Sequence, residues 1–390
     1  MTLMNMNIIK TFTKKIFFGG LYPAIYRHFC RKNAVDGSIL LLELRFGRLS
    51  DNLMPYYRHY KKSGKKVRVL CLDTEHKKGA ALLRTYIRLF RAVSRARIVY
   101  LTESSNVLAA VKIRPETKLI QVWHACGAFK RFGYGLPDAP KEAYYNAYDL
   151  TPVSGKRIEE IYAQSMHQQQ EKVRALGVAR TDICFSEKYI AAALEKVRQA
   201  VPAAAGKQII AFIPTFRGNV ANAQMPALPE IERLCASWKD SAVLLYKGHP
   251  AVQERPEIPS ASADFFFDVT DCIETESLMA AADILITDYS SVIFDFSLYQ
   301  KPMIFYTYDL DAYDDGRGFY FPFQTFVPGK ICRNTEELLR AGTEALCGLW
   351  DREQVRRFKE DFMGACDGHS LERITDAVER IANQDQKDQA

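Results

Sequence analysis

The sequence lacks the features that would place the chain in several other classes of protein. No stretch approaches the roughly 20 consecutive apolar residues that span a membrane, and lysines interrupt the apolar N-terminus where a signal peptide needs a clean run. The nine cysteines include no CxxC pair, which argues against a disulfide scaffold and a zinc site. No internal repeat, low-complexity tract or nucleic-acid-binding motif is present. These absences predict a cytoplasmic protein with reduced thiols, no nucleic-acid partner and no tightly bound metal, and they leave a loosely held Mg²⁺ open.

The length of 390 residues predicts two domains. Apolar runs typical of buried strands alternate with helical patterns, which predicts parallel sheets and an α/β fold. The stretch 200–207 (AVPAAAGK) interrupts this alternation and marks the domain boundary. We therefore predict two doubly wound parallel-sheet domains facing a cleft, at 33–200 and 207–375, with a polar tail at 376–390. The predicted strands are 38–42, 66–72, 96–101, 118–123, 208–213, 242–247, 265–269, 284–287 and 302–306, and the predicted helices include 77–93, 188–199 and 277–282.

Positive charge is concentrated near the N-terminus. Residues 1–32 hold six lysines and arginines, no acidic residue and many apolar and aromatic residues. This combination suits either the surface of an anionic membrane or an N-terminal helix that packs on the protein itself. A second basic feature is Arg84, Arg88, Arg91 and Arg95, whose steps of four, three and four form one stripe on a helix. The stripe is either a solvated helix face or a contact for lipid headgroups or an anionic acceptor.

The segment 283–296 (DILITDYSSVIFDF) predicts a strand, a short turn and a helix. The strand ends at Asp288 and Tyr289, and Ser290 and Ser291 stand where the helix would begin. Two serine hydroxyls and the free N–H groups of a helix N-terminus suit a phosphate, although serines at this position also serve as ordinary helix caps.

Two further strands end in residues suited to an anionic ligand. The segment 244–250 (LLYKGHP) places Lys247 and His249 around a glycine after a strand, and 213–219 (IPTFRGN) places Thr215 and Arg217 after another. A guanidinium fork matches phosphate oxygens. Each of these residues also has a structural interpretation, as a turn residue or a partner in an internal ion pair.

His124 follows the strand at 118–123 and precedes small residues in QVWHACGAFKRFG (121–133). Imidazole is a suitable general base toward a hydroxyl at neutral pH, and a hydrogen-bonded structural histidine is the competing interpretation. Farther along, Asp309, Asp311, Asp314 and Asp315 do not match the calcium-loop spacing, so we interpret them as an acidic surface loop.

Taken together, these segments resemble the CDP-glycerol:poly(glycerophosphate) glycerophosphotransferases, which build teichoic-acid-type polymers. The similarity covers roughly residues 95–370 and includes Trp-His, Pro-Thr-x-Arg, Lys-x-His-Pro, Ile-Thr-Asp-Tyr-Ser-Ser and Lys-Pro…Tyr-Asp…Arg-Gly in the family's order. Many members read Trp-His-Gly where this chain reads Trp-His-Ala-Cys-Gly, and that departure leaves the acceptor open. The resemblance implies a glycosyltransferase-B-like fold that acts peripherally at the cytoplasmic face of the membrane.

The resemblance also implies how the residues divide the work. His124 would activate the acceptor hydroxyl as a catalytic base. His249, the second catalytic histidine, would hold the donor pyrophosphate together with Thr215, Arg217, Lys247, Asp288, Tyr289, Ser290 and Ser291.

The expected reaction moves glycerol-phosphate from CDP-glycerol to a lipid-linked teichoic-acid or capsule-type acceptor and releases CMP. Three alternatives remain. They are ribitol-phosphate transfer from CDP-ribitol, a sugar-nucleotide glycosyltransferase of the same fold, and a non-catalytic module that binds an anionic polymer.

Overall fold

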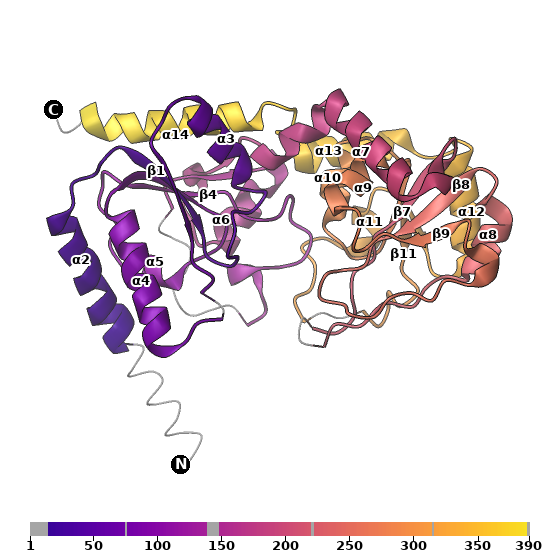
Figure 1. Ribbon diagram of the computed structural model, residues 1–390, viewed down its shortest axis with the longest axis horizontal. Helices are drawn as coiled ribbons and strands as arrows, with labels where there is room; N and C mark the ends of the chain where they lie inside the picture. Colours follow the sequence, from indigo (N-terminus) through magenta and orange to yellow (C-terminus); the bar gives the residue numbers. More distant parts are fainter. Residues whose placement is uncertain (1–14, 75, 139–147, 220–221, 314–315, 388–390) are drawn as a thin grey trace, which may run out of the picture. The chain divides into compact units, whose positions relative to one another are not determined.

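The structure is a computed structural model that describes residues 15–74, 76–138, 148–219, 222–313 and 316–387 (Figure 1). The chain divides into two compact units. Unit 1 comprises Met1–Ala125, Gly133–Asp182 and Ala365–Ala390, and unit 2 comprises Cys126–Phe132 and Ile183–Gly364. Asp314 and Asp315 of the predicted acidic loop, like Lys10 and Lys14 of the basic N-terminus, lie outside the described residues.

Unit 1 is built on a four-stranded parallel sheet in the order β2-β1-β3-β4. The strands β1, β3 and β4 are buried along nearly their whole length, whereas the edge strand β2 is only partly buried. A separate two-stranded parallel pair, β5-β6, accompanies this sheet. The strands are β1 Ser38–Glu43, β2 Val67–Cys71, β3 Ala96–Leu101, β4 Lys118–Gln121, β5 Thr151–Val153 and β6 Val173–Ala175. The α-helices are α2 Tyr22–Lys32, α3 Met54–Lys62, α4 Gly79–Val93, α5 Asn106–Ala109, α6 Glu159–Ser165 and α14 Ser370–Lys387.

Unit 2 is built on a six-stranded parallel sheet in the order β12-β11-β10-β7-β8-β9. Its core includes the fully buried Trp238 from α8, packed with apolar side chains of the central strands. The strands are β7 Gln208–Phe212, β8 Ala242–Tyr246, β9 Phe266–Asp268, β10 Ile284–Thr287, β11 Met303–Tyr306 and β12 Lys330–Cys332. The α-helices are α7 Glu187–Ala200, α8 Ile231–Trp238, α9 Thr275–Ala281, α10 Val292–Ser297, α11 Phe323–Phe326, α12 Thr335–Leu346 and α13 Arg352–Met363.

The structure confirms the α/β class, the two parallel sheets and all nine predicted strands to within two residues at either end. The division between the compact units differs from the predicted boundary at 200–207. The chain enters unit 2 at Ile183, because α7 packs against α9 of that unit.

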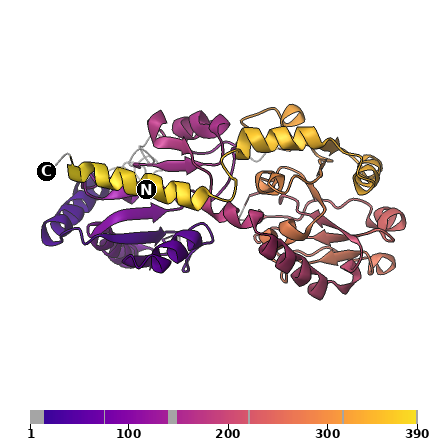
Figure 2. The same cartoon turned by 90° about the horizontal axis from the view of Figure 1, so that it is seen from above.

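The C-terminal residues also differ from the prediction of a polar tail at 376–390. Those that the structure describes, 376–387, belong to α14, which lies along unit 1 in both ribbon views (Figures 1 and 2). Its residues Ile374, Ala377, Val378 and Ala382 are buried in the core of that unit with side chains from β1, β3 and β4. Asp376 and Arg380 are exposed on the opposite face, so this part of the chain is an amphipathic helix.

Candidate active site

The predicted phosphate-binding segments of unit 2 meet at one edge of its sheet. Parallel strands present their carboxyl ends at the same edge, and β10, β7 and β8 are neighbours in the sheet. Chain order runs from β7 toward β9 on one side and from β10 toward β12 on the other, so the direction of winding reverses between β7 and β10. Ligands of open α/β sheets bind in the crevice beyond the strands at such a switch point.

Arg217 occupies this switch point and is held by two carboxylates. Its Nη1 donates to Asp288 Oδ2 at 2.9 Å and to the Thr215 carbonyl at 2.7 Å. Its Nε and Nη2 donate to the two carboxylate oxygens of Asp309 at 2.6 and 3.1 Å. Four of the five guanidinium N–H groups therefore have partners within the protein. The structure shows the internal ion pair that was the alternative interpretation of Arg217, and a contact from its remaining N–H to a phosphate stays a prediction.

Asp288 and Tyr289 are also internal. Asp288 is 1% exposed, and its Oδ1 accepts the backbone N–H groups of Thr215 at 2.7 Å and Tyr289 at 2.6 Å. The Tyr289 ring is fully buried, stacks on Tyr313 with 3.6 Å between ring centroids and donates its hydroxyl to Asp309 at 3.0 Å. The side chains of Asp288 and Tyr289 therefore hold the turn between β10 and α10 in place from the interior of unit 2.

Burial governs the electrostatics of this network. It raises the pKa of Asp288 above its usual range, and the positive charge of Arg217 opposes that shift. Burial also disfavours the charge of Arg217, but the hydrogen bonds that it donates to Asp309 and the negative charge of Asp288 outweigh burial and raise the pKa of the guanidinium. The negative charges of Asp288 and Asp309 offset the positive charge of Arg217, so this network has no net positive charge that would attract a phosphate.

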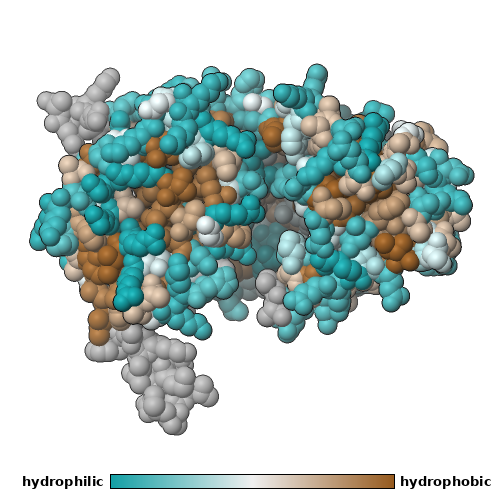
Figure 3. All heavy atoms as spheres, in the orientation of Figure 1, coloured by the Kyte–Doolittle hydropathy of each residue, from teal (hydrophilic) through white to brown (hydrophobic). Residues whose placement is uncertain are grey.

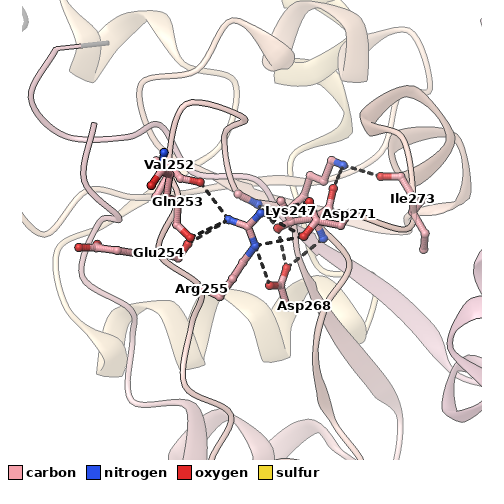
Figure 4. Close-up of polar contacts among 10 residues, drawn as sticks. Lys247, Val252, Gln253, Glu254, Arg255, Asp268, Asp271 and Ile273 are labelled. Atoms are coloured by element: carbon pink, nitrogen blue, oxygen red, sulfur yellow. Dashed lines mark hydrogen bonds and ion pairs between the residues drawn. The ribbon is translucent and has the colours of Figure 1, made fainter. Parts of the chain in front are cut away.

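Lys247 is tied to the loop that follows the neighbouring strand β9. Its ammonium donates to the carbonyls of Thr270 and Ile273, each at 2.5 Å, and burial lowers its pKa (Figure 4). Thr270 also accepts the Gly248 N–H on its hydroxyl at 2.9 Å. Lys247 thus fixes the turn that leads to His249, and two of its three ammonium N–H groups are already used.

Arg255 makes a second connection between the same two loops. Its guanidinium donates to the carbonyls of Val252, Gln253 and Glu254 and to both carboxylate oxygens of Asp271 (Figure 4). The loop carrying His249 is therefore braced on both sides, which sequence reasoning did not anticipate.

His249, Ser290 and Ser291 are the predicted donor contacts that reach solvent. His249 is exposed, accepts the Ala251 N–H on Nδ1 at 3.1 Å and lies against the Phe216 ring with 4.7 Å between centroids. Ser290 is half-buried and accepts the Val292 N–H at 3.4 Å, while Ser291 is exposed at the N-cap of α10. Because α10 has only six residues, the hydroxyls and backbone N–H groups matter more here than a helix dipole.

In unit 1, His124 is paired with a carboxylate that sequence reasoning missed. His124 Nδ1 lies 3.1 Å from Glu103 Oε1, and the two side chains are 39% and 22% exposed. Glu103 follows β3 and His124 follows β4, and these neighbouring strands are aligned with Leu101 opposite Gln121. The pairing follows from strand order, which the sequence alone does not reveal.

A strained backbone supports the His124 ring. Trp123 has φ of 56°, an uncommon conformation for a bulky residue, and its indole stacks on His124 with 4.3 Å between ring centroids. The buried Gln121 side chain accepts the Trp123 N–H at 2.9 Å and donates to the Glu103 carbonyl at 3.2 Å. One amide thus fixes the backbone on both sides of the His124–Glu103 pair.

The predicted basic stripe is on the surface of unit 1. Arg84, Arg88 and Arg91 are exposed along α4, and Arg95 is half-buried just beyond its end. Helix α2 packs against α4 through Tyr22, whose ring contacts two aromatic residues of α4. Hydrophobic side chains gather at the surface over α2 (Figure 3).

No helix in the described part of the chain is long and apolar enough to cross a membrane. Likewise, within the described ranges no group of three or more His, Cys, Asp or Glu side chains could hold a metal ion.

The fold matches solved structures of a wall teichoic acid polymerase. An H444N variant of TagF superposes with a TM-score of 0.73 over 99% of this chain and 100% of that one, at 18% sequence identity. Two parallel-sheet units with this likeness define a glycosyltransferase-B-like α/β fold. The chain belongs to the CDP-glycerol:poly(glycerophosphate) glycerophosphotransferase family, whose sequence model matches residues 24–380.

Two curated relatives come from Bacillus spizizenii. A teichoic acid ribitol-phosphate primase is 32% identical over 95% of this chain and 98% of its own length. A teichoic acid poly(ribitol-phosphate) polymerase is 36% identical over 73% of this chain, and that match spans only 46% of the polymerase.

Proposed function

We propose that this chain transfers a polyol-phosphate unit from a CDP-activated donor to a hydroxyl group of a teichoic-acid-type or capsule acceptor and releases CMP. Membership of the glycerophosphotransferase family supports glycerol-phosphate as the transferred unit. The observation that carries the proposal is the switch point of unit 2, where three neighbouring strands end beside exposed groups suited to a pyrophosphate.

In this proposal the donor is held by exposed side chains on a rigid support. His249, Ser290 and Ser291 contact the pyrophosphate oxygens, and the one remaining N–H of Arg217 completes the contacts. The side chains of Asp288, Tyr289 and Lys247 act as the support, since each is already used within unit 2. Thr215 joins the support through its backbone N–H and carbonyl. Phosphoryl transfer depends mostly on positioning and charge stabilisation, so a rigid turn is as important as the contacts themselves.

The acceptor hydroxyl attacks the β-phosphorus in line, the bond from that phosphorus to the CMP oxygen breaks, and CMP leaves with the bonding electrons. His124 takes the hydroxyl proton on Nε2, because Nδ1 faces Glu103. The carboxylate orients the ring and stabilises the imidazolium that forms, as in other histidine–carboxylate pairs.

Ribitol-phosphate is a second candidate for the transferred unit. The ribitol-phosphate primase matches this chain over nearly its whole length. Groups that contact the CDP part do not sense polyol length, so the donor residues named above serve either donor.

Turnover of the two donors tests the proposal directly. We would incubate the protein with CDP-glycerol or CDP-ribitol, with and without a lipid-linked acceptor analogue and Mg²⁺, and measure CMP release. Acceptor-dependent release from one donor is the expected result and selects the polyol. Release from neither, in a folded protein, would move the assignment to a sugar-nucleotide transferase or a polymer-binding module.

Histidine variants test the assigned roles. We expect His124→Ala and His249→Ala each to lower kcat by about 10²-fold or more, because each removes a proton acceptor or a charge-stabilising contact. Circular dichroism checks folding, and near-normal turnover by either folded variant would remove that residue from its role.

The exposed basic stripe supports a peripheral position on an anionic membrane, which we propose to be the cytoplasmic face. Simultaneous alanine replacement of Arg84, Arg88 and Arg91 is expected to weaken binding to anionic liposomes at low salt. A matched variant that removes Lys61, Lys62 and Lys65, which are exposed on or just after α3, should bind as the wild type does. Equal binding by both variants would leave the stripe as a solvated helix face.

A further inference from the structure

Unit 1 has a switch point of its own, which the proposed reaction does not yet use. The strand order β2-β1-β3-β4 reverses the direction of winding between β1 and β3. Glu43 ends β1 and Thr102 follows β3, and the Thr102 hydroxyl lies 3.5 Å from both Glu43 carboxylate oxygens. The crevice of a doubly wound sheet opens at this point, beyond the strands.

The loop that leaves β1 at this point is basic and aromatic. Arg45, Phe46, Gly47 and Arg48 are all exposed, and Phe46 is 47% exposed although its ring is apolar. The Arg45 guanidinium carbon lies 5.5 Å from the centroid of the Phe46 ring. A Cβ atom at Gly47 would meet nothing within 4 Å, so the space beside the loop is open.

The base of this loop is fixed by buried groups. The Glu43 side chain is fully buried and accepts the Arg45 N–H at 3.2 Å. The Leu44 carbonyl accepts both the N–H and the hydroxyl of Thr74, at 2.9 and 3.0 Å. A loop held in this way presents its exposed side chains without a large ordering cost on binding.

The loop lies on the same sheet edge as the proposed general base. Strands β1 and β4 flank β3 on either side, so their carboxyl ends are about 10 Å apart at the usual strand spacing. Glu103 extends from β3 between them and pairs with His124. An acceptor whose hydroxyl reaches His124 and whose chain runs across the sheet edge would meet the loop at 45–48.

We propose that the loop Arg45–Phe46–Gly47–Arg48 is the acceptor subsite and that it binds a phosphodiester of an anionic polyol or sugar chain. The two guanidinium groups contact phosphate oxygens, for which their planar geometry is suited. The Phe46 ring packs against the carbon edge of the adjoining polyol or sugar. This inference rests on the proposed function, because it names the acceptor that His124 deprotonates.

The test compares charge removal at the two edges of the sheet. Arg45→Ala/Arg48→Ala removes two positive charges from the loop, and Lys61→Ala/Lys62→Ala removes two from the last turn of α3. Helix α3 runs back from the end of β1 toward the start of β2, so Lys61 and Lys62 belong to the opposite edge. The acceptor is a short synthetic glycerol-phosphate oligomer, and the KM values for oligomer and donor are measured separately.

We expect the loop variant to raise the KM for the oligomer about tenfold, equivalent to about 1.4 kcal/mol of binding free energy, and to leave the KM for the donor unchanged. The α3 variant should change neither. Arg45→Lys/Arg48→Lys should recover only part of the loss, because lysine keeps the charge but not the paired N–H groups. An unchanged oligomer KM in the loop variant, or a raised donor KM, overturns the proposal.

Direct binding separates this proposal from the proposed function. Calorimetric titration of the oligomer into wild-type and loop-variant protein needs no turnover, so weaker binding by the loop variant supports the subsite even if no CMP is released. If the wild type turns over and binds the oligomer no more tightly than the loop variant does, the subsite proposal is wrong and the proposed function stands. If the loop variant instead loses affinity for anionic liposomes and keeps its affinity for the oligomer, the loop contacts the membrane and not the acceptor.

Discussion

Replacing Arg217 by alanine distinguishes an internal brace from a phosphate contact. The Arg217 side chain is 16% exposed, and its partners Asp288 and Asp309 are 2% and 19% exposed. Alanine at this position leaves the buried Asp288 and the half-buried Asp309 without the cation that pairs with both. Removing one partner of a buried ion pair costs about 3–5 kcal/mol, which is a large part of the stability of an ordinary domain.

The destabilisation should depend on pH in a defined direction. Burial raises the folded-state pKa of Asp288 above its unfolded-state value, so the folded protein binds more protons and stability rises as pH falls through that pKa. Arg217 opposes this shift, and its removal moves the folded-state pKa of Asp288 higher still. The loss of stability in Arg217→Ala should therefore be largest at neutral to alkaline pH and shrink on acidification.

Urea unfolding followed by tryptophan fluorescence measures this effect, because the fully buried Trp238 reports on unit 2. Arg356→Ala is the control, since Arg356 pairs only with exposed glutamates on α13 and should change little. The double variant Arg217→Met/Asp288→Asn should recover part of the lost stability, because the charge of the buried Asp288 leaves together with that of Arg217 while Asp309 remains unpaired. If Arg217→Ala unfolds at the wild-type urea concentration yet no longer binds donor, Arg217 does not stabilise unit 2 and acts instead as a phosphate contact.

Three further variants test neighbouring parts of the site. Glu103→Gln should lower kcat at least about tenfold, which is part of the roughly 10²–10⁴-fold that a general base contributes. The KM for the donor should stay unchanged, because the substitution misorients His124 without touching the donor. Steady-state kinetics measure both values. Gly127→Ala places a Cβ 2.3 Å from the Phe294 ring at φ of 65°, and it should cost about 1–3 kcal/mol in urea unfolding. Lys247→Met keeps the aliphatic stem but leaves two carbonyls without their donor, which should cost about 1–3 kcal/mol, and unchanged stability would show that the tether is dispensable.

The sequence predicts the strands of both sheets well because buried parallel strands appear in a sequence as continuous apolar runs. It also places the chemistry at strand ends, and parallel strands bring those ends to one edge whatever their order. The three-residue strands β5, β6 and β12 were missed because runs this short carry no periodic signal. The equally short β9 was found because it lies in the apolar run 265–269. The amphipathic character of α14 was missed because its charged outer face hid a buried stripe that includes Ile374 and Val378.

The partners of the site residues were harder to predict than the residues themselves. Asp309 and Asp311 stand two positions apart in one acidic segment, yet Asp309 pairs with the half-buried Arg217 whereas Asp311 is 80% exposed and pairs with Arg333. Nothing local separates the two aspartates. Glu103 pairs with His124 only because β3 and β4 are neighbours, and strand order is decided by the packing of the whole unit.

The two switch points of this chain differ in the exposure of their cations. In unit 2, Arg217 and Lys247 make internal contacts, so in the proposed reaction the pyrophosphate would contact His249, serine hydroxyls and backbone N–H groups. In unit 1 the arginines of the 45–48 loop stay exposed. Salt screens exposed charges far more than short hydrogen bonds in a fixed turn. Raising the ionic strength should therefore raise the KM for an anionic acceptor more steeply than the KM for the donor. A donor KM with the steeper salt dependence would place the exposed cations at the nucleotide instead.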